Sequence, residues 1–202
     1  MNITSVSHFP LKLLLLLLFR HYRMACGGVL AQLLMAATMA SAQTSPTHSE
    51  NAVKAAFLHK FSEFTEWPPE AFSALEPSFG IGVYGNDDVA AELEKIVADR
   101  MVNGRPVVAR YIRELEPHTN AHILFIANQR DNKFPDLPNL LLGPILVVTE
   151  QDIELPPGSV INFFIDQGRV RFAVSLPAAK KRSLKLSARL LAVAKKVEGH
   201  AR

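Results

Sequence analysis

Three glycines have the spacing of a dinucleotide-binding fingerprint, a motif that binds phosphate groups. They are Gly80, Gly82 and Gly85, and in that fingerprint such glycines follow a strand and open a helix, where free backbone N–H groups meet a pyrophosphate. Here they fall inside an apolar run that itself predicts a strand, and Asp87 and Asp88 would place negative charge where the phosphates should lie. We therefore interpret these glycines as residues that ease packing or end the strand, and we expect no cofactor.

Two histidines, His118 and His122, are four residues apart, which is the spacing of zinc ligands on a helix. Pro117 indicates a loop, however, and His122 opens an apolar strand, so helical spacing does not apply. No cysteine or carboxylate cluster completes a zinc set, and we expect two unrelated histidines and no metal. We also find no nucleophile elbow and no Ser-His-Asp arrangement that spacing supports. The sequence predicts no catalytic residues and a protein that is not an enzyme.

The charges are unevenly distributed along the chain. Residues 1–42 contain three basic and no acidic residues, so residues 43–202 balance nineteen basic against nineteen acidic residues. A general nucleic-acid-binding domain carries a strong basic excess, so we expect no nucleic acid among the partners. Within this neutral part, residues 180–202 nevertheless carry eight basic residues against Glu198 alone.

Two interpretations of this basic end stay open. One is a solvated helix face, with cations placed favourably near a helix C-terminus. The other is a surface for an anion or an acidic partner, because Arg169 and Arg171 alternate on the outer face of a predicted hairpin and could join Lys185. A ligand pocket around Lys60, Arg171 and Lys185 would require the first and last helices to be neighbours.

The first 42 residues have the pattern of an export signal. A basic cluster that ends at Arg23 precedes a second apolar run, 24–39, and small residues follow up to Ala42. Signal peptidase requires this order of basic flank, apolar core and small residues, so we predict cleavage after Ala42. The alternative is an uncleaved membrane anchor, although the Ala- and Gly-rich run is weakly hydrophobic for that role. The only cysteine, Cys26, lies in this segment, so we expect no disulfide in the mature chain.

The mature chain alternates strand and helix patterns. After a flexible N-terminus, 43–49, a helix is predicted over 50–66, where Val53, Phe57 and Phe61 recur at helical spacing and Lys54 falls off the apolar stripe. Further strands are predicted at 79–85, 105–112, 123–126, 145–148, 160–165 and 170–174, and further helical segments at 86–97, 131–142 and 176–197. This order predicts an α/β fold: one three-layer domain over 50–198 with a mostly parallel central sheet plus a C-terminal β-hairpin and helix.

Three single residues carry further predictions about local structure. Gly168 is expected to supply positive φ in the turn of the hairpin. Ser187 is expected to cap the second half of the last helix. Trp67 follows the first helix and is a candidate partner contact if it is exposed. The alternative is that it closes the core at the end of that helix, because aromatic residues are mostly buried.

Taken together, the segments resemble the YfiR family of secreted bacterial proteins. The resemblance covers residues 50–197 and rests on the order and spacing of blocks that are each weak alone. These blocks are ENAVKAAFL at 50–58, FTEWP at 64–68, NGRPV at 103–107, HILFI at 122–126, INF at 161–163, RVRFAV at 169–174, LKLS at 184–187 and LL at 190–191.

The resemblance implies a periplasmic α/β protein without catalysis. The best-known member represses an inner-membrane diguanylate cyclase by acting on its periplasmic sensor region, and so lowers cyclic-di-GMP signalling. Ligand contacts in the family lie near the positions that match Lys185 and Ser187. The family's two disulfide pairs match Gly82 with Ala121 and Leu155 with Asn162, so redox control by cysteine cannot operate in this chain.

We therefore predict a periplasmic regulatory binding protein, secreted through a cleaved signal peptide. Its expected partner is the periplasmic part of an inner-membrane signalling protein such as a diguanylate cyclase, and its partner-binding residues are expected to be Trp67 and Arg169. Lys60, Arg171, Lys185 and Ser187 are the expected ligand-binding residues. The alternative is a periplasmic small-molecule binding module that serves another receptor or a transport system. A homodimer is a further hypothesis, because symmetric self-association is common.

Overall fold

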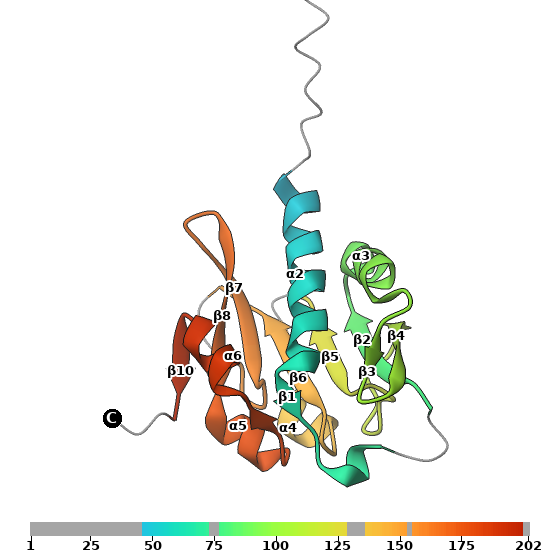
Figure 1. Ribbon diagram of the computed structural model, residues 1–202. Helices are drawn as coiled ribbons and strands as arrows, with labels where there is room; N and C mark the ends of the chain where they lie inside the picture. Colours follow the sequence, from blue (N-terminus) through green and yellow to red (C-terminus); the bar gives the residue numbers. More distant parts are fainter. Residues whose placement is uncertain (1–45, 73–76, 129–135, 153–154, 200–202) are drawn as a thin grey trace, which may run out of the picture. The chain divides into compact units, whose positions relative to one another are not determined.

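The computed structural model describes residues 46–72, 77–128, 136–152 and 155–199 (Figure 1). A boundary between two units of the chain falls between residues 44 and 45, and everything described below belongs to the second unit. The expected signal peptide, 1–42, and its cleavage site lie outside the described residues. No helix within the described ranges is both long enough and apolar enough to cross a membrane.

The described chain folds into helices and strands that alternate along most of its length. The helices are α2 (Pro46–Glu63), α3 (Asp87–Val97), α4 (Leu137–Leu140), α5 (Leu176–Lys181) and α6 (Ala188–Val193), with one 3-10 turn, η2 (Pro69–Ala71). The strands are β1 (Thr65–Glu66), β2 (Phe79–Tyr84), β3 (Met101–Val102), β4 (Arg105–Ile112), β5 (Ile123–Ile126), β6 (Leu146–Glu150), β7 (Ile161–Asp166), β8 (Arg169–Ser175), β9 (Lys185–Leu186) and β10 (Lys196–Glu198).

The main sheet has the strand order β10-β8-β7-β6-β5-β2-β4-β3. Its centre is parallel from β4 through β2, β5 and β6 to β7, and antiparallel pairs occur at β7–β8 and at β3–β4. At the other edge, β10 pairs with β8 in parallel. A separate two-stranded sheet joins β1 to β9. The α/β class and the mostly parallel sheet predicted from the sequence are confirmed.

The two faces of the sheet bury cores of unequal size. On one face α2 lies across the middle of the sheet with α3 beside it (Figure 1), and these helices cover a large core that includes Leu58, Phe61, Phe125 and Phe163. The other face carries a smaller apolar cluster, to which the short helix α4 contributes. The buried members of this cluster are Leu124, Ile126, Leu137, Leu141, Ile145 and Val147. The central strands are therefore buried on both faces, as their nearly continuous apolar runs require.

Local sequence signals explain where several elements begin and turn. The side chain of Asn86 accepts a hydrogen bond from the backbone N–H of Val89 at 3.0 Å and so caps α3. Gln167 and Gly168, between β7 and β8, both have positive φ, at 50° and 70°. Two successive residues with positive φ give a two-residue hairpin turn whose twist matches that of the strands. The predicted hairpin is therefore confirmed. Positive φ was expected at Gly168, and Gln167 adopts it as well.

The prediction of one long helical region over 176–197 is wrong. The segment instead forms α5, β9, α6 and β10 in succession. Ser183, just after α5, has a φ of 56°, which interrupts the helix, and Ser187 caps a new helix by accepting a hydrogen bond from Leu190 N–H at 3.3 Å. Val197, expected on the apolar helix stripe, lies in β10 opposite Val174 of β8. Strand pairing therefore outweighs helical periodicity at this end, while the cap predicted at Ser187 is confirmed.

The first helix also differs from its prediction in extent and in its buried face. It begins at Pro46, within the segment expected to be flexible, and it ends at Glu63 because Thr65–Glu66 pair with β9. Val53, expected on the apolar stripe, is 39% exposed, whereas Lys54, expected off the stripe, is buried. Two carboxylates hold Lys54 on the buried face, an arrangement that hydrophobic periodicity alone does not predict.

Candidate binding surface

The hairpin formed by β7 and β8 presents two different faces. In its register Phe163 pairs with Phe172, Ile165 with Val170 and Asp166 with Arg169. The first two pairs lie on the face turned toward α2, because Phe57 of α2 contacts Phe163 and Phe172 at ring-centroid distances of 6.0 and 5.5 Å. Residues alternate between faces along a strand, so the side chains of Arg169 and Arg171 lie on the opposite face.

The aromatic packing between α2 and the hairpin thins out toward the turn. Phe61 and Phe163 are fully buried and Phe57 is partly buried, but Ile165, two residues nearer the turn than Phe163, is 44% exposed. Val53, one helical turn before Phe57, is 39% exposed. The hairpin turn and the N-terminal half of α2 extend toward the same end of the domain (Figure 1). The core thus continues into a partly exposed apolar strip at this end.

Basic side chains lie on the opposite face of the hairpin from this strip. Arg169 and Arg171 are exposed, and Lys195, just before β10, contacts Asp166 at 2.8 Å. The hydrogen bond from Lys195 lowers the pKa of Asp166 below its usual value, and the charges of Lys195 and Arg171 act in the same direction. Asp166 is thereby kept as a carboxylate within a cationic surface. We name Val53, Ile165, Val170, Arg169 and Arg171 together the hairpin surface.

A buried ion cluster fixes α2 above the sheet near this end. The ammonium group of Lys54, 4% exposed, contacts Glu50 of the same helix and Glu150 at the end of β6, each at 2.5 Å. The helical spacing of Glu50 and Lys54 is a signal for a local pair. The third member lies 96 residues away in sequence, so only the fold reveals it.

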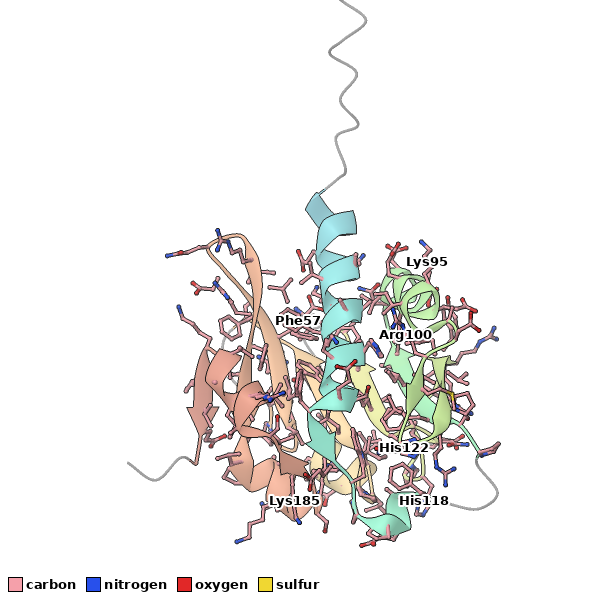
Figure 2. All side chains as sticks on the ribbon, viewed as in Figure 1. Phe57, Lys95, Arg100, His118, His122 and Lys185 are labelled. Carbon is pink, nitrogen blue, oxygen red and sulfur yellow. The ribbon has the colours of Figure 1, made fainter. Side chains whose placement is uncertain are left out.

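The four residues expected to bind a ligand do not form one pocket. Lys60 is exposed and contacts Glu63 of its own helix at 2.8 Å, and Ser187 is engaged as a helix cap. Lys185 lies on β9, which pairs with β1 directly after α2, so the segment that follows the first helix adjoins the C-terminal region. Lys185 nevertheless lies at the opposite end of the domain from the hairpin turn that Arg171 adjoins (Figure 2). Ligand binding by any of these residues stays a prediction.

Trp67 does not meet the condition set for a partner contact, because it is only 8% exposed. Its indole packs edge-on against Phe79 at a centroid distance of 5.1 Å, and its Nε1–H donates a hydrogen bond to the carbonyl of His122 at 3.3 Å. Trp67 therefore closes the core after the first helix, which is the second of the two interpretations made from the sequence.

The remaining motifs of the sequence have structural roles. The Nδ1 atom of His122 accepts a hydrogen bond from Gly80 N–H at 3.1 Å, and its ring stacks on Phe79 at 4.5 Å, while His118 is exposed. Within the described ranges, no three His, Cys, Asp or Glu residues gather as a metal site would require. A Cβ atom at Gly80 would lie 3.0 Å from Nε of Arg110, and one at Gly82 would lie 2.9 Å from Cγ1 of Ile112. These glycines therefore allow close packing, as interpreted from the sequence.

The fold defines a small α/β domain whose hairpin carries partly exposed apolar residues on one face and basic residues on the other. The chain belongs to the YfiR/HmsC-like family, which it matches over residues 51–195. This match confirms the resemblance found in the sequence, and it supports a regulatory role in cyclic-di-GMP signalling. A search of curated proteins found no match for this chain.

The positions that the resemblance matches to disulfides carry other contacts here. A Cβ atom at Gly82 would lie 3.3 Å from Cβ of Ala121, so these two positions adjoin. The Asn162 side chain donates a hydrogen bond to the carbonyl of Gln151 and accepts one from the Thr149 hydroxyl, both at 2.9 Å. Packing at one position and hydrogen bonds at the other thus hold neighbouring segments together.

Proposed function

We propose that the protein is exported to the periplasm and there binds the periplasmic part of an inner-membrane signalling protein, a diguanylate cyclase, so that cyclic-di-GMP production falls. Family membership supports the regulatory role, and the signal-peptide pattern of residues 1–42 supports export. Within this proposal the domain acts by binding and not by catalysis.

The hairpin surface is the observation that carries the proposal. Val53 and Ile165 are large apolar side chains exposed at the same end of the domain, and clustered exposed apolar residues with a polar rim are typical of protein interaction sites. Arg169 and Arg171 add positive charge on the opposite face of the same hairpin. Their charges favour a partner with acidic residues on the surface that receives the hairpin, because complementary charges raise the association rate and select the partner.

Repression follows if the domain binds the inactive state of the cyclase more tightly than the active state. A ligand shifts an equilibrium only by its difference in affinity for the two states. A tenfold preference corresponds to about 1.4 kcal/mol, which is enough to reduce the active fraction several-fold when the two states are close in free energy. No chemical step is required of the domain.

The test compares two charge reversals of equal size in a strain that lacks the gene. Deletion is expected to raise cyclic-di-GMP and biofilm, and the wild-type gene should restore both. Arg169→Glu with Arg171→Glu should fail to restore them, whereas Lys95→Glu with Arg100→Glu, on and just after α3 across the domain (Figure 2), should succeed. Unchanged cyclic-di-GMP after deletion, or full repression by the hairpin variant at equal protein abundance, contradicts the proposal.

A second candidate function is a small-molecule binding module that serves another receptor or a transport system. A cavity of about 560 Å³ favours it, because ligand sites commonly have volumes of about 300–1,000 Å³. A thermal-shift screen against nucleotides and amino acids, combined with a pulldown of membrane proteins, separates the two functions. Strong stabilisation by a ligand without a captured membrane partner supports the module.

A further inference from the structure

The cavity of about 560 Å³ lies beside α5, away from the hairpin turn. Its walls come from α5, the segment before β6 and the segment before β7. Gly158 brings two of these walls together: its φ is +85°, and a Cβ atom there would lie 2.8 Å from Cδ of Pro138 at the start of α4. A larger residue is therefore excluded at this point, and the glycine allows the cavity wall to close.

Arg182, which directly follows α5, supplies the main charge of the cavity. Its guanidinium is partly buried, and its Nη1 donates hydrogen bonds to the carbonyls of Leu141 at 3.2 Å and Gly143 at 3.3 Å. Burial lowers the pKa of this arginine, since a charge is disfavoured where water is excluded. Among the residues that the structure describes, no carboxylate forms an ion pair with Arg182. The guanidinium is thus held in place by carbonyl groups, which carry no full negative charge.

The other polar groups of the cavity define which ligand would fit. Lys181 adds a second cation and Glu198 one acid, so the lining carries a net charge of one. The hydroxyl of Ser159 already donates to the carbonyl of Ile161 at 2.7 Å, and that of Ser175 caps α5. The remaining lining residues are leucines, glycines, one alanine and four prolines, so apolar side chains and polar groups share the wall. The lining therefore combines a net positive charge with apolar side chains, which suits a ligand with one negative charge and an apolar part.

We propose that this cavity binds a small organic carboxylate with one negative charge, whose carboxylate pairs with Arg182 and Lys181 while its apolar body packs against the prolines. Arginine suits this role because its planar fork of donors matches a carboxylate. The site is separate from Lys185 and Ser187, neither of which lines the cavity. It depends neither on the hairpin surface nor on a cyclase partner, so it stands or falls independently of the proposed repression.

The probes are benzoate and hexanoate, which combine one carboxylate with an apolar body, with benzamide and inorganic phosphate as comparisons. The ¹⁵N-labelled protein, purified as cells produce it, is titrated with each probe and followed by NMR. We expect saturable shifts of the Arg182 Nε–H signal and of the amides of Ser159 and Ala178 with the carboxylates. Benzamide, which has the shape of benzoate without its charge, should cause no such shifts.

Substitutions in and beside the cavity test whether the carboxylates bind there. Arg182→Met should weaken carboxylate binding by about tenfold to a hundredfold, because a hydrogen bond to a charged group contributes this much. Lys180→Gln removes a neighbouring cation that does not line the cavity, so it should leave binding unchanged. Ala178→Phe fills the cavity and keeps Arg182, so it should abolish binding even if Arg182→Met does not fold.

Three results would overturn the proposal. The first is the absence of saturable shifts with both carboxylates. The second is binding that survives in the folded Arg182→Met or Ala178→Phe variant, since the carboxylate would then lie elsewhere. The third is binding of benzamide or inorganic phosphate as tight as that of benzoate, because the site would then not select an apolar monoanion.

Discussion

In the ion cluster of Lys54, Glu50 and Glu150, removal of the lysine should destabilise the protein less than removal of the two carboxylates, because only the lysine is fully buried. The carboxylate oxygens each lie 2.5 Å from Nζ of Lys54. With their side chains unmoved after Lys54→Met, these oxygens would lie no more than about 5 Å apart, where two unit charges repel by at least about 3 kcal/mol at an effective dielectric constant of about 20 and about 1 kcal/mol in water. Both carboxylates are partly exposed, so we expect a loss of about 1 kcal/mol.

Removing the two carboxylates instead should be more harmful. Glu50→Gln with Glu150→Gln leaves the ammonium group of Lys54 buried without a counter-charge, which costs about 3–5 kcal/mol in comparable cases. We expect about 3 kcal/mol, at the lower end, because the amide oxygens still accept hydrogen bonds. A matched control is Lys60→Met, which removes an exposed pair on the same helix and should change stability by less than about 1 kcal/mol.

Urea unfolding followed by circular dichroism gives the free energy of unfolding for all four proteins. The expected order of destabilisation is the double glutamine variant, then Lys54→Met, then Lys60→Met. If Lys54→Met destabilises more than the double variant, the lysine is not the costly buried group. If both lie within about 0.5 kcal/mol of the wild type, the cluster does not hold α2 in place.

Three further predictions concern the core. Trp67→Ala should destabilise by about 3–5 kcal/mol. In the wild type, the fluorescence emission of this single tryptophan should shift to longer wavelength on unfolding. An unchanged emission maximum would mean that Trp67 is already exposed in the folded protein. Gly82→Cys with Ala121→Cys should form a disulfide under oxidising conditions once the Ile112 side chain shifts to admit the new Cβ atom. The disulfide should stabilise by up to about 4 kcal/mol against the reduced protein, the value for closing a loop of about 40 residues. Free thiols after oxidation of the folded variant would contradict this prediction. Burial lowers the pKa of His59 below its ordinary value of 6.5. As pH drops through about 6.5 the unfolded state therefore takes up a proton before the folded state does, and the free energy of unfolding should fall. This loss should be smaller in His59→Gln, and identical pH profiles of the two proteins would contradict the prediction.

The sequence predicts most of the sheet because its signals there are local. The continuous apolar runs of β5 and β6 and the cap at Asn86 do not depend on distant residues. The C-terminal segment is different: its apolar residues also recur at helical spacing, yet Val197 pairs with β8, and such pairing with a distant strand outweighs local propensity.

The candidate site was predicted only in part for the same reason. Arg169 and Arg171 were placed on one face of the hairpin, as their alternation along a strand dictates. The hypothesis that Arg171 and Lys185 share one pocket depended on tertiary structure that the sequence pattern does not encode, and the fold places Lys185 at the opposite end of the domain from the hairpin turn. Arg182 carries no local signal at all, because the carbonyls of Leu141 and Gly143 that hold it lie about 40 residues away.

The most direct test of the regulatory account is photo-crosslinking in intact cells from the hairpin surface. A photoreactive amino acid is placed at Ile165 or, as a control, at Met101, which is also apolar and exposed but lies on β3 at the other edge of the sheet. We expect Ile165 to capture an inner-membrane protein with a periplasmic region and a diguanylate cyclase domain, and Met101 to capture none. Equal capture from both positions, or no membrane protein captured from Ile165 in cells whose cyclic-di-GMP the protein represses, would contradict the account.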